Sequence, residues 1–245
     1  MDYDAVVIGG GVIGSAIVRY LSLYDMKTLL VEKEEDISSG TTKANSGIVH
    51  AGYDPEPDTL KAKLNVKGAK MIREESEKLH FDYKVNGAMV VSFSPDDDYK
   101  IDELYERGIK NGVEDMEILS GDEARKIEPN LSENVTKCLY LKSSAIVCPF
   151  SLTQALAENA YENGAEFKFN TKVENIERID GGYRVITDTS SSITTRTVIN
   201  AAGVYGDAIN NMVSEKNIKV KFYSVFQHNV RTLRALFVQE WTFTN

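Results

Sequence analysis

The chain has little of what several classes of protein require. It contains two cysteines, Cys138 and Cys148, whose spacing fits neither a metal site nor a disulfide framework. Its 28 basic residues are outnumbered by 37 acidic ones, which argues against nucleic acid as a partner, because duplex binding needs clustered Lys and Arg. No apolar run approaches the roughly 20 residues of a membrane-spanning helix, and the first residues lack a signal peptide's basic region. These absences favour a reduced, cytoplasmic globular protein. They still allow an anionic small substrate.

The first 32 residues predict a β-α-β unit. Residues 3–8 form a short β-branched run suited to a buried parallel strand, and apolar residues then recur at helical spacing from 12 to about 24. A second apolar run at 27–32 predicts the next strand. A long segment rich in Ser, Thr and Gly follows at 33–57, and a loop of this length inside a compact domain is usually functional or disordered.

The remaining pattern is mixed and then returns to α/β. We expect helices at about 58–79, 96–110 and 150–163, a strand at 87–93, and a short helix opened by the Ser120–Glu123 capping box. A strand at 166–169 and a β-meander at 171–178, 183–187 and 195–200 complete the expected elements. This order predicts a discontinuous cofactor domain at 1–80 and 146–215, carrying part of a substrate domain at 81–145.

The strongest chemical signal is a glycine fingerprint between the first strand and helix. Gly9, Gly11 and Gly14 have Gly-x-Gly-x-x-Gly spacing, which provides a tight turn, close approach of backbone to a pyrophosphate, and close helix–strand packing. The helix N-terminus adds free N–H groups for the phosphates. Glu32 ends the second strand, where an acid can bind ribose hydroxyls and repel a 2′-phosphate, which disfavours NADP. The pattern predicts a dinucleotide site.

Two further segments resemble one family of flavoproteins. SSGTTKANSGIVHAGY (38–53) and TVINAAGVYGD (197–207) are similar to segments of the FAD-dependent family of D-amino-acid oxidase, glycerol-3-phosphate dehydrogenase and L-2-hydroxyglutarate dehydrogenase. The resemblance covers about residues 1–215 and makes an NAD-dependent dehydrogenase the weaker alternative. It implies FAD as cofactor. The implied fold is α/β, with an FAD-binding doubly wound (Rossmann-like) sheet, a β-meander and an inserted, incomplete α+β substrate domain.

The resemblance also implies roles for individual residues. Gly9, Gly11 and Gly14 would hold the pyrophosphate and Glu32 the adenosine ribose. The other implied cofactor contacts are Thr41 and Thr42 along the pyrophosphate and ribityl chain, Ser46 and Gly47 at the isoalloxazine, Val173 at adenine, and Ala202 and Gly203 closing over the cofactor.

His50 is the candidate catalytic residue. It lies in the cofactor loop and can exchange a proton near neutral pH; the alternative is a structural histidine that bonds loop backbone. His80 and His228 have no supporting residues around them. Lys61 and Lys63 can attract an anion, although lysines on a helix more often form a solvated face. Cys148 is expected to pack rather than to react.

These features favour hydride transfer to flavin from a small anionic hydroxy compound, either glycerol 3-phosphate or a 2-hydroxy acid. The arginine that grips phosphate after the His-Gly segment in many glycerol-3-phosphate dehydrogenases is absent, because Tyr53-Asp54-Pro55 stands there. The alternatives are an amine or amino-acid oxidase and a catalytically silent FAD-binding fragment. Peripheral membrane attachment, a quinone acceptor and the oligomeric state stay open.

The segment 216–245 is set apart by composition. It carries five basic residues against one acid, holds the single Trp, and has no clear strand or helix pattern after residue 226. We expect a divergent tail at the end of a truncated product, which would leave the substrate pocket and one flank of the flavin incomplete.

Overall fold

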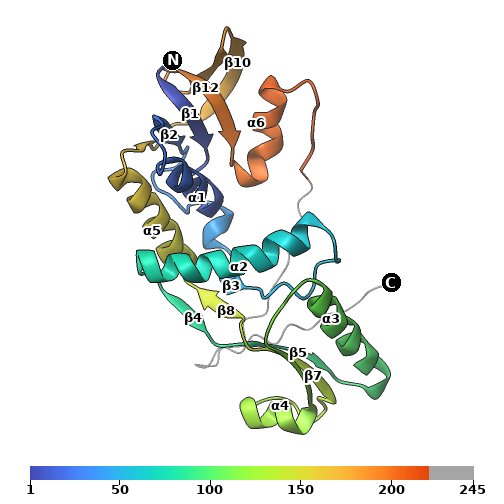
Figure 1. Cartoon of the computed structure of the whole chain (residues 1–245). Coiled ribbons are helices and arrows are strands. Elements are labelled where there is room, and N and C mark those ends of the chain that lie inside the picture. Colours follow the sequence, from blue (N-terminus) through green and yellow to red (C-terminus); the bar gives the residue numbers. More distant parts are fainter. Residues whose placement is uncertain (221–245) are drawn as a thin grey trace. The chain divides into compact units, whose positions relative to one another are not determined.

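The computed structural model describes residues 1–220, and these group into two compact units (Figure 1). Among the described residues, unit 1 comprises 1–46, 79–81 and 148–220, and unit 2 comprises 47–78 and 82–147. The chain therefore leaves unit 1 after residue 46, earlier than the expected boundary at 80, and returns at 148, close to the expected 146. Most of the segment from 216, including His228, lies outside the described residues.

Unit 1 is built on a six-stranded sheet in the order β10-β11-β12-β1-β2-β9. Strands β12, β1, β2 and β9 are parallel, and β10, β11 and β12 form an antiparallel meander. In β12 the pairing with β11 covers residues 192–195 and the pairing with β1 covers residues 195–200, so one strand serves both parts. The strands are β1 (Tyr3–Ile8), β2 (Thr28–Val31), β9 (Glu166–Lys168), β10 (Val173–Ile179), β11 (Gly182–Thr187) and β12 (Ser192–Asn200).

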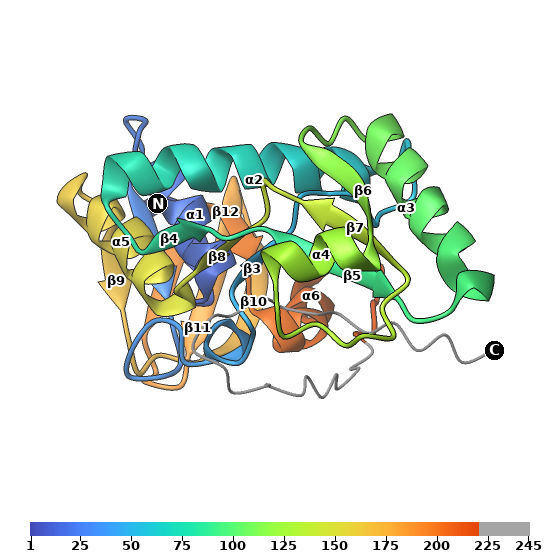
Figure 2. The same ribbon diagram turned by 90° about the horizontal axis from the view of Figure 1, so that it is seen from below.

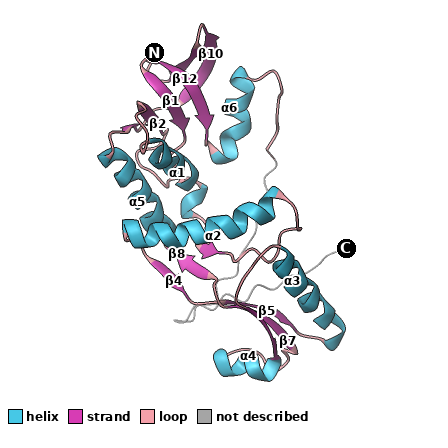
Figure 3. Ribbon diagram, viewed as in Figure 1, coloured by secondary structure: helices cyan, strands magenta, loops and turns pink. Residues whose placement is uncertain are grey.

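Alternate side chains of the parallel strands enter two separate cores, as the period of two of a strand requires. On one face, Val6 and Val31 pack with residues of the meander and with helix α6 (Gly206–Val213). On the other face, Val7 and Leu30 pack with α1 (Val12–Leu21) and the end of α5 (Pro149–Glu162). Figures 1 and 3 show α1 beside α5 and, separately, α6 beside β10. Both faces of the parallel strands are thereby covered.

Unit 2 contains two antiparallel three-stranded sheets, β3-β8-β4 and β5-β7-β6. In the second sheet, Leu139 and Leu141 of β7 enter a core with helix α3, and Cys138 enters a core with α4 on the other face. Figure 2 shows the helices α3 and α4 beside this sheet. The strands are β3 (Ile48–Val49), β4 (Tyr83–Val85), β5 (Ala88–Ser92), β6 (Met116–Ser120), β7 (Lys137–Leu141) and β8 (Ala145–Val147). The helices are α2 (Leu60–Leu79), α3 (Asp98–Lys110) and α4 (Gly121–Ile127). Short 3-10 turns lie at Thr41–Lys43 (η1), Pro95–Asp97 (η2) and Gly203–Tyr205 (η3).

The expected elements are confirmed, with differences at their ends. Strand β1 spans the expected residues, and helix α1 ends at Leu21 rather than near 24. Strands β3, β4, β6, β7 and β8 and helix α6 were not predicted. The short β4 and β8 have three residues each, so neither contains enough positions to display a period.

The capping box of α4 gives a test of local stability. The Ser120 hydroxyl accepts a hydrogen bond from the Glu123 backbone N–H at 3.3 Å, and the Glu123 carboxylate accepts one from the Ser120 N–H at 2.8 Å. Ser120→Ala removes the cap and is expected to lower the free energy of unfolding by about 1 kcal/mol. Ser76→Ala is the control, because the Ser76 hydroxyl only donates to the Arg73 carbonyl within α2. Equal urea midpoints for S120A and the unmutated chain would contradict the prediction.

Candidate functional site

The glycine turn lies at the carboxyl end of β1, the edge of an open parallel sheet where ligands bind. Gly9 adopts φ +111°, a conformation that favours glycine. A Cβ at Gly9 would lie 2.5 Å from the Ala201 carbonyl oxygen, so the end of β12 packs directly on the turn. The Ala201 N–H donates to the Ile8 carbonyl at 2.9 Å and fixes this contact. The fingerprint and the late segment 197–207 are therefore neighbours in unit 1.

The other two fingerprint glycines have different surroundings. A Cβ at Gly14 would lie 1.8 Å from the Gly9 carbonyl oxygen, so any side chain there would push α1 away from β1. A Cβ at Gly11 would meet only the Thr42 hydroxyl, at 3.0 Å, and no other atom within 4 Å. Gly14 thus permits helix–strand packing, and Gly11 borders open space that a ligand can approach.

The N-terminus of α1 presents unpaired backbone donors to this space. The Val12 N–H donates to the Thr42 hydroxyl at 3.0 Å, and the Ser15 N–H donates to the Gly11 carbonyl. Within residues 1–220, the N–H groups of Ile13 and Gly14 have no acceptor. Such donors at the positive end of a helix suit phosphate oxygens. A pyrophosphate therefore fits the residues present.

Glu32 is held at the same edge by the backbone. Its carboxylate accepts hydrogen bonds from the Gly10 N–H at 2.5 Å and from the Glu34 N–H at 3.0 Å, one to each oxygen. A carboxylate has about four acceptor positions, so both oxygens keep capacity for ribose hydroxyls. The two backbone bonds orient the acid before any ligand binds.

The cofactor loop folds against the fingerprint through residues that sequence reasoning gave no role. The Ser38 N–H donates to the Gly10 carbonyl at 3.0 Å, with Ser38 in a left-handed conformation of φ 61°. The Asn45 side chain donates to the Thr42 carbonyl at 2.6 Å and closes the turn that carries Thr41. Thr41 is exposed and Ser46 half-buried. Neither Ser38 nor Asn45 has a distinguishing sequence pattern beyond its place in the loop.

The remaining cofactor candidates in unit 1 converge on the same end of the sheet. The Thr171 N–H donates to the Glu32 carbonyl at 2.9 Å, two residues before Val173, which is buried in the core with Val31. Ala202 approaches the glycine turn, since a Cβ at Gly9 would lie 3.1 Å from its Cα. Gly203, with φ +53°, has no atom within 4 Å of a built Cβ and borders open space.

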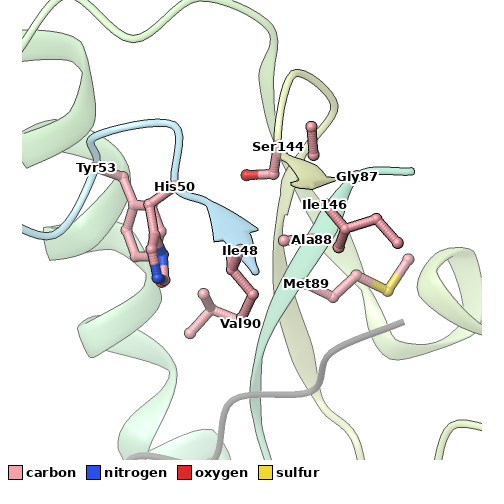
Figure 4. Close-up of a pocket in the computed structure, with 10 residues that line it drawn as sticks. Ile48, His50, Tyr53, Gly87, Ala88, Met89, Val90, Ser144 and Ile146 are labelled. Atoms are coloured by element: carbon pink, nitrogen blue, oxygen red, sulfur yellow. The ribbon is translucent and has the colours of Figure 1, made fainter. Parts of the chain in front are cut away.

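Gly47 and His50 belong to unit 2, where they flank β3. The Gly47 carbonyl accepts a hydrogen bond from the Val147 N–H at 2.8 Å, which continues the pairing of β3 with β8. His50 follows β3 and lines two cavities together with Tyr53. The first contains apolar residues of β5 and β8, among them Ala88 and Ile146 (Figure 4). The second has a volume of about 250 Å³ and is also lined by Gly52, Asp54, Pro55, Lys61 and Asn65.

The surroundings of His50 favour its neutral form. Desolvation by nearby protein atoms lowers the pKa of His50 below its ordinary value of 6.5, although the residue is exposed to solvent. Asp54 opposes this lowering of the pKa and Lys61 adds to it. A neutral imidazole can accept a proton at pH 7. In the described chain, no hydrogen bond to the ring fixes its orientation.

Asn65 adds a polar atom that the sequence did not single out. Its Oδ1 atom is buried in the wall of the second cavity, and no donor in residues 1–220 reaches it. A buried acceptor without a donor is costly, so a ligand hydroxyl in this cavity would satisfy it. Lys61 and Lys63 are both exposed on α2, and Lys61 alone lines the cavity. Cys148 is half-buried at the start of α5.

None of the helices described within residues 1–220 has both the length and the apolar character needed to cross a membrane.

Comparison with known proteins places this geometry in a family. The family model described as FAD dependent oxidoreductase (DAO) matches residues 4–241, a span that includes part of the segment from 216 that we expected to diverge. The chain is 45% identical over 218 residues to a glycerol 3-phosphate dehydrogenase of Caloramator mitchellensis, covering 89% of this chain and 45% of the relative. A glycerol 3-phosphate oxidase of Mycoplasma pneumoniae is 34% identical, with 85% and 56% covered.

Solved structures agree with the fold. The L-alpha-glycerophosphate oxidase of Mycoplasma pneumoniae with FAD bound superposes with a TM-score of 0.85 at 34% identity, over 89% of this chain and 58% of that one. A glycine oxidase of Bacillus cereus gives a TM-score of 0.76 at 26% identity, over 85% and 57%. The chain spans about half the length of the curated relatives it matches. It belongs to the family of FAD-dependent oxidoreductases, whose cofactor is FAD.

Proposed function

We propose that this chain binds FAD at the glycine turn of unit 1. The observation that carries the proposal is the pair of N–H groups, of Ile13 and Gly14, that have no acceptor in the described chain and belong to the first turn of α1, next to the open space at Gly11. The pyrophosphate would lie there, with the adenosine ribose on Glu32 and the adenine near Val173. Thr41, Thr42, Ala202 and Gly203 would line the rest of its path. Ser46 and Gly47, which follow in the same loop, would lie close to the isoalloxazine ring.

We propose oxidation of a small anionic hydroxy compound as the activity, with glycerol 3-phosphate as the first candidate substrate. Bound FAD supplies an acceptor for the hydride that leaves the substrate carbon. His50 would accept the hydroxyl proton on a ring nitrogen, for which its lowered pKa keeps it neutral at pH 7. The Asn65 Oδ1 atom would accept a hydrogen bond from a substrate hydroxyl in the same cavity.

The choice of glycerol 3-phosphate depends on the relatives. Its dehydrogenase and oxidase are 45% and 34% identical to this chain, whereas the human L-2-hydroxyglutarate dehydrogenase is 30% identical. A 2-hydroxy acid is therefore the second candidate. Oxidation of an amine is more distant, because the matching glycine oxidase is 26% identical. Tyr53-Asp54-Pro55 stands where many glycerol-3-phosphate dehydrogenases have an arginine, so the residues that grip the anion would lie elsewhere.

We propose that the protein is located in the cytoplasm. This proposal is based on the acidic composition and on the two cysteines, which lack disulfide spacing. The relatives include both a dehydrogenase and an oxidase, so molecular oxygen and a quinone at a membrane surface are the two acceptors to compare. Oxygen consumption by the purified chain, with and without a soluble quinone, separates them.

The fingerprint glycines give a matched test of cofactor binding. Gly11→Ala places a methyl group in open space beside Thr42, so we expect the fold to persist while FAD affinity falls at least about 10-fold, because the backbone can no longer approach the pyrophosphate. Gly14→Ala forces α1 off β1, so we expect a lower melting temperature even without FAD. Thermal melts with and without FAD, and FAD titration, measure both. Unaltered FAD affinity in folded G11A would contradict the placement.

Anaerobic bleaching of the yellow chain tests the chemistry. Glycerol 3-phosphate should bleach bound FAD, and His50→Asn should slow bleaching about 10²–10⁴-fold, because it removes the proton acceptor. His80→Asn is the control: His80 is exposed at φ 56°, a conformation that Asn tolerates. A yellow chain that no candidate substrate bleaches would support the silent fragment instead.

The pH dependence of bleaching tests the state of His50. Protonation of the imidazole removes its acceptor nitrogen, so the rate should fall as pH drops through a pKa below 6.5. The substrate phosphate also titrates near pH 6, but it does so equally for the His50→Asn variant. The unmutated chain should therefore lose rate at low pH relative to H50N. Parallel pH profiles for the two proteins would rule out His50 as the base.

A further inference from the structure

The segment that carries His50 is held by two side chains of helix α3. Within the described residues it belongs to no strand or helix between β3 and α2. The Asn111 side-chain NH₂ donates to the carbonyls of Gly52 at 3.0 Å and Pro55 at 2.7 Å. The Arg107 guanidinium donates to the Asp54 carbonyl at 2.9 Å. Three carbonyls of four consecutive residues are therefore held by α3.

An ion pair extends the same contact. The Arg107 guanidinium lies 3.0 Å from the Glu56 carboxylate, while the Arg107 side chain is 30% exposed and that of Glu56 is 70% exposed. An exposed pair of this kind contributes little alone. Its effect is to orient the guanidinium, which can then donate to the Asp54 carbonyl. We call Arg107, Asn111 and the backbone of residues 52–56 the loop clamp.

The helix must come close for the clamp to form. Gly108 lies between the two clamp residues, and a Cβ there would sit 2.5 Å from the Met116 sulfur and 3.2 Å from the Tyr53 Cβ. The missing side chain lets the α3 backbone approach Tyr53, which is 3% exposed. Asn111 is the C-cap residue of α3, so its side chain is placed by the end of the helix.

The side-chain amide of Asn111 makes its hydrogen bonds with the loop. Its Oδ1 atom is buried and accepts no hydrogen bond within residues 1–220, while both bonds of its NH₂ group go to the loop. The Asn111 NH₂ group faces two carbonyls, and this orientation leaves the buried Oδ1 atom without a donor. An unpaired buried acceptor costs stability, so the two bonds to the loop must compensate for that cost.

His50 has no such support of its own. In the described chain no hydrogen bond fixes its ring, so the ring's position depends on the backbone that follows it. That backbone turns at Gly52, where φ is +105°. The clamp fixes the carbonyl of this same glycine. Holding residues 52–55 therefore limits the directions in which the His50 ring can point.

We propose that Arg107 and Asn111 are positioning residues that orient His50 by clamping the loop after it. The inference rests on the proposed role of His50 as proton acceptor, and both residues act through the backbone rather than by touching a substrate. A purely structural role would instead predict a loss of stability with no change at the His50 ring.

The test is the titration of the His50 ring in the full chain, followed by NMR of labelled histidine and assigned with His50→Asn. Asn111→Leu removes the two donors and adds no charge near the ring. Releasing the loop takes protein atoms away from the ring and relieves its desolvation, so the pKa of His50 should rise toward 6.5. The charged groups facing the ring are Asp54 of the loop and Lys61 of α2, and Asn111→Leu keeps both. The strands β5 and β8 contribute only uncharged residues to the cavity wall.

Matched variants separate orientation from folding. Lys110→Gln changes an exposed neighbour at the end of α3 and should leave the titration unaltered. Arg107→Gln removes the other, partly exposed clamp side chain and is used if N111L does not fold, with a smaller rise in the pKa of His50 expected. Arg107→Lys keeps the charge near Glu56 and should restore part of the original titration. With FAD bound, the bleaching rate of N111L should fall about 10-fold at unaltered FAD affinity.

The outcomes distinguish this inference from the proposed function. Folded N111L and R107Q with the titration of the unmutated chain would overturn the clamp. The titration needs neither flavin nor substrate, so it reports on the clamp even if the chain fails to bind FAD or if His50→Asn bleaches normally. Those two results would count against the proposed function alone.

Discussion

The close contact between Gly14 and the carbonyl of Gly9 is the constraint on which unit 1 depends. A methyl group at Gly14 would lie 1.8 Å from that oxygen, so only glycine lets α1 start directly over the end of β1. The Gly10 N–H donates to the Glu32 carboxylate at 2.5 Å, so the start of α1 and the acid share one edge of the sheet. The N–H groups without an acceptor and the acid that we propose for the cofactor are therefore neighbours in unit 1.

Local signals in the sequence were sufficient for most of unit 1. The β-branched run of β1, the glycines after it and the acid after β2 each have a direct physical meaning, and the structure confirms the β-α-β unit with parallel β1 and β2. The capping box at Ser120 and Glu123 is also confirmed with both reciprocal bonds. These features depend on residues close together in the chain, which sequence patterns report well.

Features that depend on distant contacts were not predictable in the same way. Strands β4 and β8 have three residues each, and their pairing is decided by partners more than 50 residues away. The role of Ser38 depends on a bond to the Gly10 carbonyl across the loop. Asn65 and Asn111 are polar residues with no motif around them, and only the fold reveals that each has a buried oxygen without a donor in residues 1–220.

In unit 2, charged residues affect the pKa of His50, and contacts of the loop affect its position. Asp54 raises the pKa of His50, whereas desolvation and Lys61 lower it, and the net lowering keeps the ring neutral. Asp54 therefore keeps the pKa of His50 closer to its ordinary value than burial and Lys61 alone would leave it. Its carbonyl is meanwhile held by Arg107, so one residue affects both the basicity of His50 and the path of the loop that carries it.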